Sequence, residues 1–343
     1  MKIEDLSINT GANKQVLQAA SLVCPLLLHP SPATSFHSPP TMAAAAASAG
    51  TIRQAEEVNK EIQEYYHDTT SLTWEKMWGD HVHTGFYDPG VTAPSPAENR
   101  AALVRTVEEA LRFAGISDDP EKRPKRIVDV GCGIGGSSFY LAKRYGAQCD
   151  GININPTQIE RARARAAAEG LEDKVNFHLG DAMQQPFPDG HFDLVWCMDV
   201  IDHMTDREKF FRELVRVAAP GATIIITSVC RRDPEEKPFT PDEVVLLKRI
   251  CEGLHHASWF TVPGYINIAE SLPLKDIKTA DWSENIIPFW QTALQTAMSL
   301  EGSTILLESA GMALIKAVLT APTIVESLKN KLINYSIITF RKL

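Results

Sequence analysis

Ile127-Val128-Asp129-Val130-Gly131-Cys132-Gly133-Ile134-Gly135-Gly136 is the stretch that decides the fold. A short apolar run ends in glycines, and residues 137–145 after it have the pattern of a helix. A strand that turns sharply into a helix N-terminus offers bare backbone N–H groups to a nucleotide-like ligand. The glycines also have the G-x-G-x-x-G spacing, which on its own favours a dinucleotide. The carboxylate of Asp129, inside the strand, instead favours a ligand that carries an ammonium group.

Size and composition describe an ordinary α/β protein. The chain has 343 residues, 44% hydrophobic and 22% charged, which is enough for a large core with additions. A net charge of −9 without a basic stripe argues against a nucleic-acid partner. No run approaches the ~20 apolar residues that span a bilayer, so we expect no transmembrane segment. Scattered cysteines, and a His81–His83 pair without an acidic or Cys neighbour at ligand spacing, predict neither disulfides nor a metal site.

Residues 1–50 are expected to be a disordered leader, since prolines interrupt them repeatedly. Like a plastid transit peptide, the segment is rich in serine and poor in charge. Glu4 and Asp5 near the start, and the lack of arginine before Arg53, argue against one. Translation from Met42 is the alternative. A transit peptide would indicate the plastid, and a start at Met42 would indicate the cytoplasm.

Residues 51–124 are expected to form an N-terminal helical lid region. Apolar residues recur at intervals of three and four through Thr51–Gly79, which predicts a helix. The following loop, up to Gly90, gathers aromatic and histidine side chains that are costly to expose unless they cover a ligand. We therefore expect a lid over the cofactor, and a helix that only packs on the core is the alternative. The side chains expected to close the lid are Tyr65, His83 and Tyr87.

The central region, residues 125–230, alternates strands with helices. Strands are expected at Arg126–Val130, Gln148–Asn153, Lys174–Leu179, Phe192–Met198 and Thr223–Val229. This alternation predicts a Rossmann-like α/β fold with a mostly parallel, doubly wound sheet that binds its ligand at the carboxyl ends of the strands. Gly180-Asp181-Ala182 follows the third strand, which is the usual place for an adenine contact.

Capping signals mark two helix starts in this region. Asn155 precedes a proline and, three positions on, a glutamine, and residues 205–208 have the pattern of a capping box. The helix after Asn155 carries three arginines, which we expect to form a solvated face and not a phosphate site. They are Arg161, Arg163 and Arg165.

Residues 231–332 are expected to form a helical cap over the substrate. Helical segments there are interleaved with aromatic residues, and such an insertion would make an apolar wall beside the cofactor. Ordinary packing is the alternative for each aromatic taken alone. Residues 333–343 then alternate between apolar and polar side chains and predict a final strand of the sheet, at its edge.

Several stretches of the chain resemble one known family. Trp78–Asp88, Val128–Ser138, Arg216–Ile226 and Ile337–Lys342 are similar to the plant γ-tocopherol methyltransferase family. This is a branch of the class I S-adenosylmethionine-dependent methyltransferases that includes related alkaloid N-methyltransferases. The resemblance implies transfer of a methyl group from S-adenosylmethionine to a hydrophobic aromatic acceptor, as in tocopherol C-methylation, or alternatively to an amine nitrogen. A cofactor-binding protein without turnover and a nucleotide-dependent oxidoreductase are the less favoured readings.

The resemblance also assigns cofactor-binding residues. Asp129, Gly131 and Gly133 would hold the methionyl part. Asn153 stands where class I methyltransferases commonly have an acidic residue for the ribose, and an amide can also hydrogen-bond a diol, more weakly, with Gln158 assisting. The adenine ring and the adjoining wall would be contacted by Asp181, Ala182, Cys197 and Met198.

The loop after the fourth strand departs from the family pattern. Where tocopherol enzymes have Met-Glu-Ser-Gly-Glu-His-Met, this chain reads Met198-Asp199-Val200-Ile201-Asp202-His203-Met204. Each carboxylate is shortened by one methylene, and branched residues replace Ser-Gly. We therefore expect Val200 and Ile201 to narrow the floor of the site and to mark a changed acceptor pocket.

The same loop supplies the candidate catalytic residues. Methyl transfer from a sulfonium is an in-line displacement, in which an enzyme aligns donor and acceptor and, where needed, takes a proton from the acceptor. His203 is the candidate base, with Asp202 or Asp199 orienting it or contacting the acceptor; a purely structural histidine is the alternative. No metal is required. The expected partner is a small hydrophobic acceptor, and a homodimer is left open.

Overall fold

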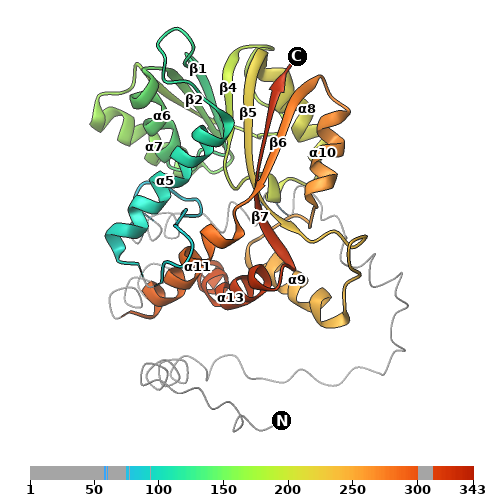
Figure 1. Cartoon of the computed structure of the whole chain (residues 1–343). Helices are drawn as coiled ribbons and strands as arrows, with labels where there is room; N and C mark the ends of the chain where they lie inside the picture. Colours follow the sequence, from blue (N-terminus) through green and yellow to red (C-terminus); the bar gives the residue numbers. More distant parts are fainter. Residues whose placement is uncertain (1–57, 59, 61–74, 77, 93, 300–311) are drawn as a thin grey trace, which may run out of the picture.

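The computed structural model describes residues 58, 60, 75, 76, 78–92, 94–299 and 312–343. A sheet of seven strands, flanked by helices, forms the centre of this part of the chain (Figure 1). The strands are β1 (Arg126–Val130), β2 (Gln148–Asn153), β3 (Val175–Leu179), β4 (Phe192–Cys197), β5 (Ala218–Arg231), β6 (Leu274–Asp281) and β7 (Ile333–Lys342). The helices are α5 (Pro96–Ala114), α6 (Gly136–Tyr145), α7 (Pro156–Glu169), α8 (Arg207–Val217), α9 (Pro241–Gly253), α10 (Val262–Glu270), α11 (Ser283–Met298) and α13 (Met312–Lys329), with a 3-10 turn η3 (Ile201–His203).

The sheet has the strand order β3-β2-β1-β4-β5-β7-β6. The first five strands run parallel to one another, whereas β7 is antiparallel to both β5 and β6. The expected Rossmann-like, mostly parallel α/β fold is therefore confirmed. The expectation that the final strand lies at the edge was wrong, because β7 lies between β5 and β6.

The edge position belongs to β6, which lies inside the insertion that was expected to be helical. Its sequence is mostly polar, and its side chains are largely exposed or half-buried. A bulge between Lys275 and Lys278 interrupts its pairing with β7. Charged side chains and bulges are typical of edge strands, which must avoid pairing with other chains. The same polarity explains why the sequence did not predict this strand, since alternating apolar residues are the signal for a strand.

Side chains of the parallel strands alternate between two apolar layers. Ile127 and Leu194 belong to a core cluster that also contains buried residues of α5, α6 and α7. Their neighbours Val128 and Val195 belong to a second cluster, with buried residues of α8 and α10. Successive residues of a strand point to opposite faces, so both faces of the sheet are covered. In an open parallel sheet of this kind, ligands bind at the carboxyl ends of the strands.

The two capping signals have different outcomes. Asn155 is the N-cap of α7, and its side chain accepts a hydrogen bond from the backbone N–H of Gln158 (3.0 Å). This prediction is confirmed. The capping box at residues 205–208 was wrong by one residue, because the cap of α8 is Asp206, which accepts from the N–H of Lys209 (2.8 Å). A carboxylate at the N-cap also interacts favourably with the helix dipole.

The insertion places three helices beside one end of the sheet. Figure 1 shows α9, α11 and α13 grouped where β7 begins. Because β7 runs antiparallel to β5, this is the end at which the parallel strands finish. The predicted helix Thr51–Gly79 lies mostly outside the described residues. No helix in the described ranges is long and apolar enough to cross a membrane.

Candidate active site

A cleft opens at the carboxyl ends of the parallel strands, as expected from the fold. The turn after β1 lines it with Gly131 and Gly133, and the ends of β2 and β3 line it with Asn153 and Asp181. Gly131 has φ 73°, and a side-chain Cβ at this position would lie 2.2 Å from Cγ2 of Val200. Only glycine fits there. The turn thus brings backbone directly to the cleft, which we call the cofactor cleft.

Asp129 is buried beneath the glycine turn. Its side chain is 3% exposed, and it accepts a hydrogen bond from the hydroxyl of Ser138 (2.6 Å). Burial raises the pKa of Asp129 to about 6, because loss of water disfavours the charged form. It lines a narrow recess that continues from the cofactor cleft, together with Gly131, Gly133 and Met198. An ammonium group in this recess would stabilise the charged carboxylate.

The residues expected to contact ribose and adenine also lie at this cleft. Nδ2 of Asn153 donates to Oε1 of Gln158 (2.6 Å), so the two amides form a pair on the cleft wall. Oδ1 of Asp181 accepts from the backbone N–H of Met183 (2.8 Å), and Ala182 lines the cleft next to it. Two amides and a fixed carboxylate suit a ligand that carries hydroxyl and heterocyclic groups.

Two of the predicted residues, Cys197 of the adjoining wall and Tyr87 of the lid, are not brought to the cleft. Cys197 is fully buried in the core between the sheet and α8, since it points to the face opposite its neighbour Met198, which does line the cleft. Tyr87 donates its hydroxyl hydrogen to Oδ1 of Asn99 (2.7 Å) and packs in an apolar cluster with α5 and α11. Tyr65 lies outside the described residues.

A second pocket adjoins the cofactor cleft. Asp199 and His203 line both of them, as does Val82 of the N-terminal segment. The walls of this second pocket come from distant parts of the chain and are mostly aromatic or apolar. They include Trp78, His83, Leu254, His256, Phe289 and Trp290. We call it the acceptor pocket, because a group bound in it would lie next to a group bound in the cofactor cleft.

Sequence reasoning missed several of these wall residues. His256 and Leu254 follow α9, and Trp290 lies in α11. The aromatic residues of the insertion were recognised as a group, but their spacing did not tell which of them face the site. The adjacent pair His255 and His256 was the available signal, because two neighbouring histidines within an apolar insertion are costly to bury without a role.

Asp199 connects the sheet to the N-terminal segment. Its Oδ2 accepts hydrogen bonds from the backbone N–H and the hydroxyl of Thr84 (both 2.9 Å). Its Oδ1 accepts from the hydroxyls of Thr227 and Tyr335 (both 2.7 Å). Asp199 itself has φ 53°, a strained conformation for a residue other than glycine. Since four donors occupy this carboxylate, it is suited to holding the segment in place and not to proton transfer.

Asp202 lies on the floor of the acceptor pocket and is 4% exposed. It accepts hydrogen bonds from the hydroxyl of Ser228 (2.6 Å) and from the backbone N–H of Val229 (3.1 Å). Burial raises its pKa to about 7. At neutral pH the group is therefore divided between its charged and neutral forms.

His203 is held in one orientation at the junction of the two cavities. Its Nδ1 lies 3.0 Å from the backbone oxygen of His255. A carbonyl oxygen can only accept, so Nδ1 carries the proton and Nε2 is left with its lone pair. Burial lowers the pKa of His203, and the ring is therefore neutral at pH 7. This is the protonation state that a general base requires.

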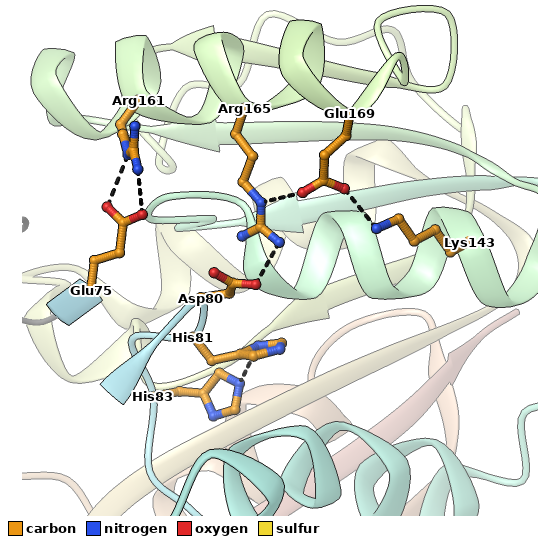
Figure 2. A network of polar contacts seen from close by, with 8 residues as sticks. All are labelled: Glu75, Asp80, His81, His83, Lys143, Arg161, Arg165 and Glu169. Atoms are coloured by element: carbon orange, nitrogen blue, oxygen red, sulfur yellow. Dashed lines mark hydrogen bonds and ion pairs between the residues drawn. The ribbon is translucent and has the colours of Figure 1, made fainter. Parts of the chain in front are cut away.

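The segment Trp78–Thr84, which we call the lid segment after the role expected from the sequence, lines both cavities through Val82. Figure 2 shows how it and Glu75 are attached to α7. The guanidinium of Arg165 binds Asp80 (2.7 Å) and Glu169 (2.7 Å), and Arg161 pairs with Glu75. Arg161 lies on a solvated face as expected, with its side chain 47% exposed. The expectation was wrong for Arg165, whose side chain is only 18% exposed because it is packed between Asp80 and Glu169. Arg163 instead donates to the backbone oxygen of Phe177 (2.7 Å).

Close packing fixes the lid segment against the glycine turn. A Cβ at Gly136 would lie 2.2 Å from the backbone oxygen of Asp80, so only glycine allows this approach. His81 and His83 lie 3.1 Å apart between Nδ1 and Nε2, and burial lowers the pKa of His81 to about 3. Among the described residues no group of three or more His, Cys, Asp or Glu is arranged to hold a metal ion.

The branched residues of the departing loop do not narrow the acceptor pocket as expected. Val200 lines the cofactor cleft and lies against Gly131. Ile201 is fully buried in the core against α8. Both side chains point away from the acceptor pocket, because η3 turns the chain after Asp199. The pocket floor is formed instead by Asp199, Asp202 and His203.

Comparison with known proteins identifies this arrangement. A family model described as a methyltransferase domain matches residues 128–226. A protein of Oryza sativa subsp. japonica named "Probable tocopherol O-methyltransferase, chloroplastic" is 52% identical over 278 residues, which cover 80% of this chain and 76% of that protein. The chain belongs to the γ-tocopherol methyltransferase family. It is an enzyme that transfers methyl groups to small molecules.

Two further similarities bear on the acceptor and the fold. Norajmaline N-methyltransferase of Rauvolfia serpentina is 42% identical over 83% of this chain and 99% of its own length. Geranyl diphosphate C-methyltransferase of Streptomyces coelicolor A3(2), solved with S-adenosyl-L-homocysteine, Mg²⁺ and geranyl diphosphate, has a TM-score of 0.65 and 16% identity, with 83% of this chain and 98% of that one covered. Relatives of this methyltransferase thus include enzymes named for different acceptor atoms, while the fold is shared.

Proposed function

We propose that this methyltransferase takes its methyl group from S-adenosylmethionine bound in the cofactor cleft. The residues present fit that molecule. The recess at Asp129 suits the ammonium, and an added Cβ at Gly133 would meet no atom within 4 Å, which leaves space over the turn. The Asn153–Gln158 pair suits the ribose hydroxyls, and Asp181 suits the adenine. When bound, the cofactor supplies an electrophilic methyl group on a sulfonium.

We propose a neutral, hydrophobic aromatic acceptor of the tocopherol type, methylated at a ring carbon. The observation that carries this is the acceptor pocket itself, which joins the cofactor cleft at His203. Its walls include the rings of Trp78, Phe289 and Trp290, and aromatic surfaces of this kind suit a flat ring. The name of the Oryza sativa relative supports tocopherol as the acceptor, although it names oxygen as the methylated atom; methylation at the ring carbon rests on the resemblance to the family.

The chain's own residues divide the chemical work. Nε2 of His203 would accept the proton of a phenolic hydroxyl, which raises the electron density of the ring carbon. As this carbon bonds to the methyl group, the bond from the methyl group to sulfur would break. The ring hydrogen would then leave as a proton to water, and His203 would return its proton to the oxygen, which restores the aromatic ring and the neutral base. Asp199 holds the lid segment closed through Thr84, so that water is kept from the reacting atoms. The walls of the two cavities align donor and acceptor, which is the main requirement of an in-line displacement.

This role of His203 predicts a pH profile. Because burial lowers the pKa of His203 below its ordinary 6.5, the base stays neutral as the pH falls through 6.5. We expect kcat to decline only below that value, as the ring becomes protonated. His203→Gln should lower kcat by about 10²–10⁴-fold. Because His203 also lines the cofactor cleft, the affinity for the cofactor is measured separately by calorimetry, and it should fall far less than kcat. A profile whose acid limb survives in the variant would contradict this assignment.

An amine acceptor is the second candidate, favoured by the similarity to norajmaline N-methyltransferase. A protonated amine would seek an uncompensated carboxylate. Asp199 is occupied by four donors, and burial raises the pKa of Asp202 to about 7. An amine would have to displace existing hydrogen bonds of Asp199 or ionise the buried Asp202, so the pocket suits a neutral ring better.

The decisive experiment is to incubate the purified chain with methyl-labelled S-adenosylmethionine and a panel of acceptors. The panel holds γ-tocopherol and several indole and benzylisoquinoline amines, with His203→Gln as a parallel sample. We expect label on tocopherol carbon. Label on an amine alone would overturn the acceptor class, and no label on any member of the panel would overturn the proposed function.

We propose that the leader directs the protein to the plastid, in line with the chloroplastic name of the Oryza sativa relative. Fluorescent fusions of the full chain and of a chain starting at Met42 test this. We expect only the full-length fusion to enter plastids. A cytoplasmic signal from both fusions would contradict the proposal.

We further propose a division of roles along the chain. Residues 51–124 act as the lid region, 125–230 as the cofactor core and 231–332 as the acceptor cap, with 333–343 completing the sheet. Limited proteolysis tests the first of these roles. Cofactor should slow cleavage within residues 75–92, and an unchanged cleavage rate would contradict a lid.

A further inference from the structure

Arg207 is a buried residue at the start of α8 that the reaction outlined above does not use. Its side chain is 5% exposed. Burying a guanidinium is costly, because the group stays charged and loses its water. The four hydrogen bonds of its terminal nitrogens go to uncharged oxygen atoms. The role of this buried charge must therefore lie in the segments of the chain that the guanidinium binds.

The guanidinium joins two segments on either side of the acceptor pocket. Nη1 donates to the backbone oxygen of Met204 and to the hydroxyl of Ser258 (2.9 Å). Nη2 donates to the backbone oxygens of Asp202 (3.3 Å) and Ser258 (2.9 Å). The turn that carries His203 is thereby tied to the segment after α9, which we call the 254–259 segment.

The 254–259 segment in turn orients His203. The backbone oxygen of His255 lies 3.0 Å from Nδ1 of His203, and His255 has φ 55°. This conformation is uncommon for a residue other than glycine, although histidine tolerates it better than most. The neighbouring N–H of Ala257 also donates to the oxygen of Asp202 (2.9 Å). Arg207 and this hydrogen bond together keep the His255 carbonyl aimed at the histidine ring.

We propose that Arg207 is a positioning residue for the base. It fixes the 254–259 segment so that the His255 carbonyl holds His203 as the Nδ1–H tautomer, with the Nε2 lone pair directed at the acceptor. Arg207 touches neither cofactor nor acceptor in this scheme. The inference rests on the proposed role of His203, and it names a residue that acts through another.

Electrostatics agree with the geometry. Burial is the main cause that lowers the pKa of His203, and the positive charge of Arg207 also lowers it. The other titratable groups around the ring are His255, His256, Asp199 and Asp202, with His83 across the pocket. Removing the guanidinium charge and admitting water both raise the pKa of His203, whereas a looser hydrogen bond to the His255 carbonyl lowers it. The rise should prevail, because burial is the largest of these causes. The acid limb of the kcat profile should then move to higher pH.

The test compares Arg207→Met with Arg216→Met in the full-length enzyme. Arg216 lies on the same helix and also binds a loop through backbone oxygens, those of Gln185 and Phe187. Both variants should lose thermal stability. Only Arg207→Met should lower kcat, by about tenfold to a hundredfold, with the KM for S-adenosylmethionine unchanged.

The tautomer is read directly in the absence of any acceptor. In histidine-labelled protein, ¹⁵N shifts report which ring nitrogen carries the proton, and His203→Gln identifies the signals. Wild type and Arg216→Met should have the Nδ1–H form, whereas Arg207→Met should have a mixture. An unchanged tautomer, or an equal loss of kcat in both variants, would overturn the proposal. A failure of the acceptor panel would not affect this readout.

Two milder substitutions test the same role with less risk that the variant fails to fold. Ser258→Ala removes one hydrogen bond to Arg207 and leaves the charge in place. It should lower kcat by about twofold to fivefold without moving the acid limb. Arg207→Lys keeps the charge but loses the planar fork, so it should lower kcat and leave the acid limb nearer that of wild type. A Ser258→Ala variant with unchanged kcat, or full activity in Arg207→Lys, would contradict positioning by the guanidinium.

Discussion

The cofactor cleft and the acceptor pocket meet at Asp199 and His203, but the chain builds them in different ways. The cofactor cleft is made at the ends of four parallel strands, and most of its residues lie within a few positions of a strand end. The acceptor pocket draws its walls from the lid segment, η3, the 254–259 segment and α11. One cavity follows from local turns, and the other depends on how distant segments pack.

This difference suggests that the two cavities tolerate amino-acid substitutions to different degrees. A cavity made of strand ends is as rigid as the sheet, which is buried on both faces. A cavity made of a lid and an insertion can change its walls without disturbing the sheet. Relatives that share the fold but are named for different acceptors are consistent with such a division. The comparison predicts that variants should affect the cofactor, the acceptor or both, according to the cavity they line.

The largest effect is expected for Asp129→Asn in the cofactor cleft. The change removes the charge from the buried carboxylate beneath the glycine turn and preserves its volume. Loss of a buried charge partner costs about 3–5 kcal/mol, so the affinity for S-adenosylmethionine should fall by more than a hundredfold in calorimetry.

Asp150→Asn is the matched control, because Asp150 lies on the next strand and binds His178 (2.8 Å) outside the cleft. It should leave the affinity unchanged. Tight cofactor binding by Asp129→Asn would show that the ammonium is held elsewhere, and the division between the two cavities would then be drawn in the wrong place.

An intermediate effect is expected for Trp290→Leu in the acceptor pocket. Trp290 is half-buried in α11 and lines the pocket beside Phe289. Loss of an aromatic contact of about 1–1.5 kcal/mol should raise the KM for the acceptor by about tenfold. The KM for S-adenosylmethionine should not change, and Trp290→Phe should recover most of the loss. A variant that raised the KM for the cofactor instead would contradict the separation of the cavities.

The sequence was sufficient to predict several residues that line the cofactor cleft, for a physical reason, while their role toward a cofactor stays a prediction. Gly131, Gly133, Asn153 and Asp181 each follow an apolar strand, and the carboxyl ends of parallel strands must meet at one edge of the sheet. The strand order alone is therefore enough to predict that these residues lie close together. Cys197 was misjudged by one position of alternation, since a strand sends neighbouring side chains to opposite faces.

The acceptor side was less predictable because tertiary contacts decide it. Nothing near Arg165 in sequence indicates that its partner Asp80 lies 85 positions away, and nothing near Tyr335 indicates Asp199. Val200 and Ile201 were predicted to shape the acceptor pocket because they stand in the sequence between Asp199 and Asp202, which do line it. The 3-10 turn rotates them toward the glycine turn and the core, and such a turn cannot be read from a short apolar run.

The smallest effect is expected at the lid segment, which lines both cavities. Arg165→Met removes the pair with Asp80, whose two side chains are 18% and 55% exposed, and the pair with Glu169, which lies within α7 and does not reach the lid segment. A pair this accessible contributes about 0.2–1 kcal/mol, so KM should rise by no more than about fivefold, and for cofactor and acceptor alike. Asp80→Asn should have the same effect, and the double variant should be no worse than either single one.

In wild type, high salt should also raise KM in part, because it screens the pair. Arg212→Met is the control: it removes an exposed pair on α8 and should leave KM unchanged. A rise for only one substrate would mean that the lid segment closes one cavity and that the two are more separate than their shared residues indicate.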